Sequence, residues 1–347
     1  MSTAALRAPL VAAALTLASL GAAAQPDCGA AASPECFFAF TLPGAPGQVP
    51  RGQMHYYASR VPEAPGHGAA PTSVLIALHG HSRDANKTFD AALLAARRAG
   101  TLEHTLIVAP LFQVAARAAA KCETAGVPPA QPGDLLWSCG SWAAGAEADG
   151  GRGPGSFAAM DALVGELLQQ WPSLHAVTIA GFSAGAQFTQ RYVGFAAPPP
   201  AGVSLRYVVA DPGSWLYFDA ARVLPVGASR CPAVNRWKYG TEGLPATLGA
   251  DAAQARARYA EADISYLEGE LDDSDARGTA YRVLDKSCAA NAQGLFRLQR
   301  GEAYAAYDRK SLAPAKRRQV AIAPGCAHDV ACVFPSDPGR AALFGPP

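Results

Sequence analysis

The stretch VTIAGFSAGAQFTQRYV, residues 177–193, decides how the rest of the chain can fold. Its first part is an apolar run typical of a buried strand, and a helical pattern begins directly after GFSAG, residues 181–185. This is the G-x-S-x-G pattern in the strand–turn–helix context that a nucleophilic serine requires. Glycine on both sides leaves room for a tight turn that lifts the hydroxyl above the sheet, near the positive end of the helix. The pattern predicts that Ser183 is a nucleophile, with a purely structural turn as the alternative.

Strand and helix patterns alternate on both sides of this junction. We expect strands at 36–42, 52–59, 74–80, 106–112, 176–181, 205–210, 263–267 and 318–323, and helices at 86–98, 156–171 and 184–195. This order predicts an α/β fold with a mostly parallel central sheet and helices on both faces. Residues 113–155 fit neither pattern and are rich in Ala, Gly and Pro, so we expect a functional insertion there.

The composition bounds the size and the partners of the protein. The chain has 347 residues, of which 50% are hydrophobic and 16% are charged. This suffices for one large α/β domain or two smaller ones, and we expect a single catalytic domain over residues 25–347. A net charge of +1 gives no indication of a nucleic-acid or anionic-membrane partner.

The first 24 residues are typical of a signal peptide. Arg7 precedes the apolar run APLVAAALTLASLG, and small residues follow at the cleavage positions before Gln25. The apolar run is too short for a membrane span, and a buried amino-terminal helix is the alternative. We therefore expect cleavage after Ala24 and export to the periplasm or the extracellular space.

The cysteines agree with export. There are eight, all after the expected cleavage point, and an even number in an oxidising compartment indicates disulfide bonds. No pair has CxxC spacing and no histidines cluster near them, which argues against a zinc site. Proximity in the sequence favours the pairs Cys28–Cys36, Cys122–Cys139, Cys231–Cys288 and Cys326–Cys332.

A serine nucleophile needs a base and an acid, and on α/β hydrolases these follow it in the order acid, then histidine. His328 is the only histidine after Ser183, in a Pro/Gly turn between two cysteines, so we predict that it is the base; a surface-loop histidine is the alternative. Asp272 follows a predicted strand and is the best-placed acid, because it can reach the ring nitrogen that faces away from the serine. Rival acids are Glu270, Asp273, Asp275 and Asp211.

The segment LHGHSRDA, residues 78–85, is expected to form the oxyanion hole at the carboxyl end of an early strand. We predict that the backbone N–H groups of His81 and Ala184 point at the developing oxyanion, where one donor contributes about 2.7–4 kcal/mol. His79 and His81 then shape the loop rather than titrate. Arg83 either pairs with a carboxylate or is solvated.

Four aromatic residues lie in segments expected at the carboxyl edge of the sheet. Their positions are equally consistent with lining a substrate pocket and with packing in the core. The four residues are Trp137, Trp142, Trp215 and Tyr217.

Several segments together resemble the α/β-hydrolase superfamily, most closely its secreted esterase and polyester-depolymerase-like members, over residues 50–345. They are LHGHSRDA, GFSAGAQFTQRY, YLEGELDD and PGCAHD, and RYVVADPGSWLYFD and CPAVNRWKYG are similar to segments of a hydrolase group within it. The resemblance implies an α/β-hydrolase fold and a serine hydrolase that cleaves small or polymeric carboxylic esters without a cofactor or metal. Phe182 departs from the histidine or tyrosine of many relatives, and we expect altered packing under the serine. A peptidase or amidase, and a non-catalytic binding protein on the same scaffold, are the alternatives.

Overall fold

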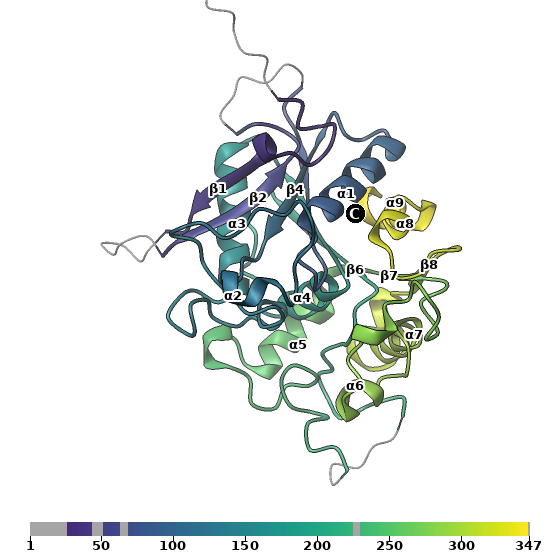
Figure 1. The fold of residues 1–347 in the computed structure, drawn as a ribbon. Coiled ribbons are helices and arrows are strands. Elements are labelled where there is room, and N and C mark those ends of the chain that lie inside the picture. Colours follow the sequence, from purple (N-terminus) through teal and green to yellow (C-terminus); the bar gives the residue numbers. More distant parts are fainter. Residues whose placement is uncertain (1–25, 44–50, 63–68, 225–229, 346–347) are drawn as a thin grey trace, which may run out of the picture.

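The computed structural model describes residues 26–43, 51–62, 69–224 and 230–345. Its described strands form one eight-stranded sheet in the order β1-β2-β4-β3-β5-β6-β7-β8 (Figure 1). The strands are β1 Phe37–Thr41, β2 Gln53–Ala58, β3 Ser73–Leu78, β4 Thr105–Leu111, β5 Ala176–Phe182, β6 Ser204–Ala210, β7 Asp263–Gly269 and β8 Val320–Ala323.

The sheet is mostly parallel, as the sequence predicts. Strands β4, β3, β5, β6, β7 and β8 run parallel to one another, and β2, antiparallel to β4, and β1, antiparallel to β2, add an edge. All seven residues of β4 are buried, because helices cover both faces and a strand in that position needs apolar side chains on both sides. Parallel strands place their carboxyl ends at one edge, where β5, β7 and β8 deliver the segments that contain Ser183, Asp272 and His328.

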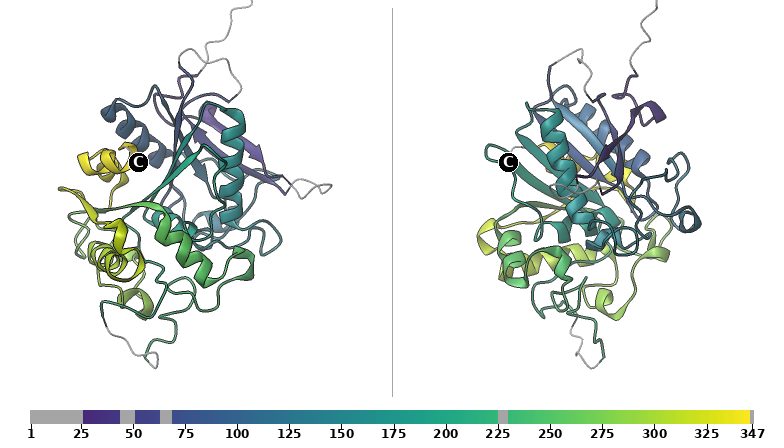
Figure 2. Two further views of the ribbon diagram at one scale, coloured as in Figure 1. Left: turned by 180° about the vertical axis from the view of Figure 1, so that it is seen from behind. Right: turned by 90° about the vertical axis from the view of Figure 1, so that its left-hand side faces the viewer.

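Helices pack on both faces of the sheet (Figures 1 and 2). On one face, Leu75 and Ala77 of β3 share a core with α1, α8 and α9. On the other face, Ile76 and Leu78 share a core with α3, α4, α5 and α7. The helices are α1 Ala85–Ala99, α2 Ala116–Ala119, α3 Ser156–Gln170, α4 Ala184–Tyr192, α5 Ala252–Glu261, α6 Cys288–Asn291, α7 Arg297–Tyr307, α8 Val330–Val333 and α9 Asp337–Phe344.

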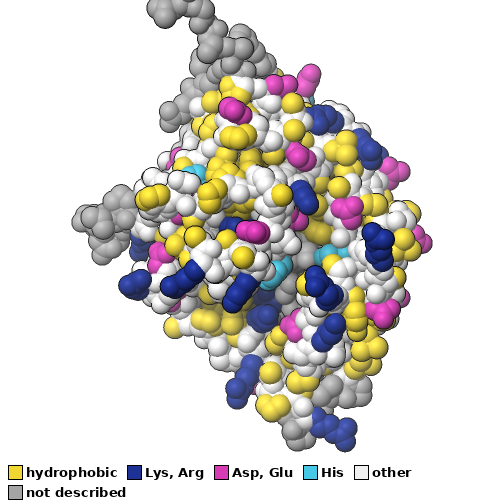
Figure 3. Space-filling view, in the orientation of Figure 1, with side chains coloured by type: hydrophobic (Ala, Val, Ile, Leu, Met, Phe, Trp, Pro, Cys, Tyr) yellow, Lys and Arg dark blue, Asp and Glu magenta, His cyan; other side chains and the backbone are white. Residues whose placement is uncertain are grey.

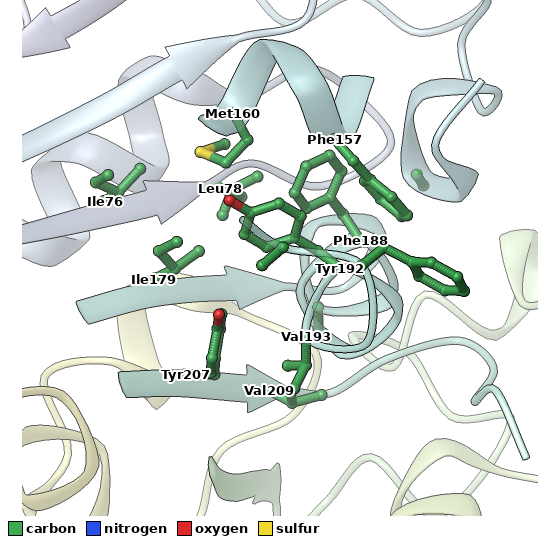
Figure 4. Close-up of a cluster of buried hydrophobic side chains, with 14 of the residues drawn as sticks. Ile76, Leu78, Phe157, Met160, Ile179, Phe188, Tyr192, Val193, Tyr207 and Val209 are labelled. Carbon is green, nitrogen blue, oxygen red and sulfur yellow. The ribbon is translucent and has the colours of Figure 1, made fainter. Parts of the chain in front are cut away.

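The core between α3, α4 and the sheet is rich in aromatic rings. Figure 4 shows Phe157 and Met160 of α3 facing Phe188 and Tyr192 of α4, above the aliphatic side chains of β3 and β5. The rings of Phe157 and Phe188 meet edge to face with centroids 5.0 Å apart, an arrangement that the quadrupoles of aromatic rings favour. This packing fixes α4, and therefore the turn at its start, against the sheet.

Residues 113–155 contain only α2, one short 3-10 helix at Trp142–Ala144 and isolated bridges. A disulfide between Cys122 and Cys139 closes part of the segment. The backbone of Trp137 pairs with Gln113 and that of Ala148 with Pro154, so the segment folds back on itself.

The four disulfide pairings favoured by sequence proximity are confirmed. The bonds join Cys28 to Cys36, Cys122 to Cys139, Cys231 to Cys288 and Cys326 to Cys332, and no described cysteine is left free. None of the helices in the described ranges has the length and hydropathy needed to cross a membrane. The expected signal peptide, residues 1–24, lies outside the described residues.

Candidate active site

Ser183 sits on the sharp turn between β5 and α4. Its backbone has φ 58° and ψ −113°, a conformation that costs energy for a residue with a side chain and is concentrated at functional sites. A Cβ atom on Gly181 would lie 2.1 Å from the Gly185 carbonyl oxygen, and one on Gly185 would lie 2.4 Å from the carbonyl oxygen of Leu78. The turn therefore closes only with glycine at both positions.

The structure brings together the three side chains that the sequence predicts for the triad. The hydroxyl oxygen of Ser183 lies 2.8 Å from Nε2 of His328, and Nδ1 of the same ring lies 2.7 Å from Oδ2 of Asp272. In the neutral ring, Nδ1–H donates to the carboxylate and Nε2 accepts from the serine hydroxyl. Both distances are within the range for proton transfer from the serine to the imidazole.

His328 is held from three directions. Its backbone N–H donates to the Gly278 carbonyl at 3.2 Å, a disulfide closes the loop from Cys326 to Cys332, and the Phe182 ring lies with its centroid 4.7 Å from that of the imidazole. Phe182 thus packs beside the imidazole, where the sequence anticipated an effect on packing under the serine. Burial lowers the pKa of His328, so the ring is a neutral base at neutral pH.

Asp272 is buried, and it follows β7 in a turn in which its N–H donates to the Gly269 carbonyl. Its second oxygen, Oδ1, accepts from Nη1 of Arg297 at 3.2 Å, so this carboxylate binds a guanidinium as well as the imidazole. The rivals do not bind the imidazole. Glu270 accepts from the N–H of Gly325, Asp273 and Asp275 are exposed, and Asp211, although within 4.8 Å of Asp272 and His328, accepts from the N–H of Gly269.

Hydrogen bonds hold the loop expected to form the oxyanion hole. Asp84 accepts from the Gly80 N–H at 2.8 Å, and the buried His79 accepts from the Phe112 N–H and donates through Nδ1 to the Gly80 carbonyl. Burial lowers the pKa of His79 to about 4, which keeps the ring neutral and agrees with a shaping role. Arg83 is buried and donates to Gln113 and to the Cys122 carbonyl, so it neither pairs with a carboxylate nor is solvated.

The two predicted oxyanion donors lie close to the serine. Ala184 is the first residue of α4, so its N–H has no acceptor within the helix. His81 and Ser183 line the same cleft, and no hydrogen bond from the His81 N–H occurs within the described residues. Their use as donors to an oxyanion stays a prediction.

A cleft with a volume of about 510 Å³ opens beside Ser183 and His328. That size is typical of small-molecule sites. Leu94, Val283 and Val330 are among its apolar lining residues, and Lys87 with Asp90 is among its charged ones. On the face shown in Figure 3, histidine side chains lie near the middle, and both Lys or Arg and Asp or Glu side chains are spread around them.

The four aromatic residues considered for a substrate pocket do not line this cleft. They are core residues, because Trp142 stacks on Phe112 and Trp215 stacks on Tyr304 while their surfaces are almost completely covered. Trp137 is 5% exposed and Tyr217 is 1% exposed. Of the two expected roles, packing in the core is therefore the one that the structure shows for Trp137, Trp142, Trp215 and Tyr217.

Two residues of the predicted triad, together with Asp211, form the only group of side chains among the described residues that could hold a metal ion. Oxygen or nitrogen atoms of Asp211, Asp272 and His328 lie within 4.8 Å of one another. However, both ring nitrogens of His328 already bind Ser183 and Asp272, and a cation here would have to displace those hydrogen bonds. The geometry suits proton transfer rather than metal binding.

Sequence reasoning missed the partners of Asp272. Arg297 lies at the start of α7, and nothing in its local pattern indicates that it reaches the predicted acid. The buried carboxyl group of Glu268 did carry a signal in the sequence, because it is an ionisable residue directly after the apolar Tyr266 and Leu267 of β7.

The architecture and the position of the serine turn define an α/β-hydrolase fold. No family model matches the chain, and no curated protein matches its sequence. Among solved structures, poly(aspartic acid) hydrolase-1 from Sphingomonas sp. KT-1 is similar, with a TM-score of 0.56 and 22% identity over 85% of this chain and 94% of that chain. The poly(3-hydroxybutyrate) depolymerase LpqC from Bordetella parapertussis is also similar, with a TM-score of 0.54 and 18% identity over 88% of each chain.

Proposed function

We propose that this protein is an exported serine hydrolase that cleaves carboxylic esters through an acyl-enzyme. The observation that carries the proposal is the unbroken hydrogen-bonded series from Ser183 through His328 to Asp272, with distances of 2.8 Å and 2.7 Å. A serine hydroxyl is a poor nucleophile while it keeps its proton, and in a series of this kind the histidine takes that proton.

The mechanism follows from the placement of these atoms. Ser183 attacks the ester carbonyl while Nε2 of His328 takes its proton, and Asp272 stabilises the imidazolium that forms. The N–H groups of His81 and Ala184 then stabilise the oxyanion. His328 gives the proton to the leaving alcohol, and water attacks the acyl-enzyme with the same histidine as base.

The proposed substrates are small or polymeric esters. A cleft of about 510 Å³ accommodates one acyl or alcohol unit, and its openness to solvent allows a longer chain to continue beyond it. The name of one similar structure, a poly(3-hydroxybutyrate) depolymerase, supports a polymeric ester as the substrate. The other, a poly(aspartic acid) hydrolase, is named for a polyamide and supports the amidase alternative. The four disulfides support export, since such bonds persist in oxidising compartments.

Replacement of the nucleophile tests the proposal. We expect Ser183→Ala to lower kcat/KM for p-nitrophenyl butyrate by about 10⁴-fold or more, because the acyl-enzyme can no longer form. Thermal melting should change little, and a fluorophosphonate probe should label the wild type at this residue alone. Ser311→Ala, at an exposed serine, is the matched control and should keep full activity.

Other outcomes would select another function. Retention of most activity by Ser183→Ala would end the assignment of the nucleophile. Hydrolysis of p-nitroanilides in preference to the matching esters would favour an amidase. A wild type that neither hydrolyses esters nor reacts with the probe would favour the non-catalytic scaffold.

A further inference from the structure

Glu268 is a carboxylic acid buried inside the sheet. It lies in β7, is 0% exposed, and packs so closely on α7 that a Cβ on Gly301 would lie 2.1 Å from its Oε1. Neither of its oxygens receives a hydrogen bond from an N–H or hydroxyl group of the described residues. A bare carboxylate in such a place would lose its hydration without compensation, so the side chain must be neutral or share a proton.

The partner of Glu268 is Asp211. Asp211 follows β6, is also 0% exposed, and accepts the N–H of Gly269 at 2.8 Å. The two buried carboxyl groups interact electrostatically, and because Glu268 has no hydrogen-bond donor from elsewhere in the described residues, one of the two must carry a proton. Burial and the charge of Asp211 raise the pKa of Glu268 well above its usual range, so Glu268 is the acid and Asp211 the carboxylate.

Asp211 of this pair lies next to the predicted triad. A carboxylate oxygen of Asp211 is within 4.8 Å of an oxygen of Asp272 and of a ring nitrogen of His328. Asp272 also binds Arg297, whose positive charge lowers the pKa of His328 and opposes formation of the imidazolium. Arg297 and Asp272 together carry no net charge, so the charge of Asp211 leaves the cluster at −1.

We propose that the buried carboxyl pair Asp211–Glu268 is a positioning unit of the active site: its single negative charge offsets Arg297, so that the imidazolium of His328 forms beside a net negative cluster. The inference rests on the proposed function. Asp211 touches neither substrate nor serine and acts through Asp272 and His328. Glu268 carries the proton that the pair shares. The negative charge of Asp211 can therefore lie beside the carboxylate of Asp272 without two unpaired anions in contact.

The pair also makes the cluster sensitive to pH. Burial and then the charge of Asp272 raise the pKa of Asp211 to about 7, while Glu268, Gly269 and Arg297 are its other electrostatic partners. His328 faces Asp272, Arg297 and Asp84. Below about pH 7 Asp211 gains a proton and its support for the imidazolium is lost, so experiments on the charged pair belong at pH 8.

The decisive variant is Asp211→Asn, which keeps the acceptor for the Gly269 N–H and removes the charge. At pH 8 we expect kcat/KM for p-nitrophenyl butyrate to fall by about tenfold or more, and the loss of activity near pH 7 that accompanies protonation of Asp211 in the wild type to be absent from the variant. Glu268→Gln keeps a donor to Asp211 and should retain most activity, whereas Glu268→Leu should not. Asp273→Asn, at an exposed carboxylate of the same loop, is the control for a general loss of charge.

A second measurement separates this inference from the proposed function. The pKa of His328, followed by NMR with His328→Gln for assignment, should rise in Arg297→Gln. The ring signals of His328 should also report the titration of Asp211 near pH 7 in the wild type but not in Asp211→Asn, whether or not esters are hydrolysed. The double variant Asp211→Asn/Arg297→Gln should recover activity relative to Asp211→Asn. If Asp211→Asn does not fold, the shift in Arg297→Gln carries the test. A folded Asp211→Asn with the wild-type pH profile and the wild-type activity at pH 8, or an unshifted pKa of His328 in Arg297→Gln, would overturn the proposal.

Discussion

At the scale of one residue, Asp272 differs from the other carboxylates of its acidic cluster in where its side chain lies, and this makes it the catalytic candidate. Asp272, Asp273 and Asp275 differ little in sequence context, yet only Asp272 turns inward, reaching Nδ1 of His328 at 2.7 Å. Its neighbours face solvent, where a carboxylate is stable without a partner.

The corresponding prediction concerns Asp272→Asn. An amide at this position holds the imidazole in the wrong tautomer, so we expect kcat for p-nitrophenyl butyrate to fall by about 10⁴-fold. Asp275→Asn serves as the matched control and should stay within about twofold of the wild type, as expected of an exposed side chain. Equal losses in the two variants would mean that Asp272 is not the acid.

The residues of the site differ in how far the sequence could reveal them. Ser183 and His328 follow from a local pattern and from chain order, and the structure places them in contact. The roles of Trp142 and Trp215 do not follow, because a tryptophan near the sheet edge has the same local pattern whether it lines a cleft or stacks in the core. The link between Asp272 and Arg297 depends on how α7 packs against β7, and no local signal encodes that.

At the scale of an element, the turn between β5 and α4 can form only because Gly185 has no side chain. We expect Gly185→Ala to destabilise the fold by about 3 kcal/mol or more, since its Cβ would meet backbone atoms of β3 that have no freedom to move. Urea unfolding measures the loss. Gly165→Ala in α3 provides the contrast: its Cβ meets nothing within 4 Å, and alanine should stabilise that helix by about 0.5–1 kcal/mol. A Gly185→Ala protein as stable as the wild type would show that the turn is looser than described.

Most elements were predictable because their patterns are local. The expected strand at 106–112 is β4 at Thr105–Leu111, and the expected helix at 156–171 is α3 at Ser156–Gln170. Residues 113–155 could not be described in advance, since their conformation comes from a disulfide and from contacts with distant core residues.

At the scale of the whole molecule, the disulfides should contribute unequally to stability. In the chain-entropy model, the bond Cys231–Cys288, with a separation of 57 residues, stabilises by about 4 kcal/mol, and Cys326–Cys332, with a separation of 6, by about 2 kcal/mol. Replacing each pair by serine and comparing urea midpoints tests this order. The short bridge should matter more for activity, because it closes the loop of His328. The reverse ranking in both measurements would contradict these assignments.

The hydrogen bond from Ser183 to His328 joins residues 145 positions apart, and the second of them lies near the carboxyl terminus. During synthesis the nucleophile is therefore made long before its base. On the proposed mechanism, a nascent chain that has completed α4 is still inert, and so is any fragment cut before β8. Hydrolytic competence then requires that β8 has docked beside β7 and placed His328, so the gain of activity during refolding reports on that docking.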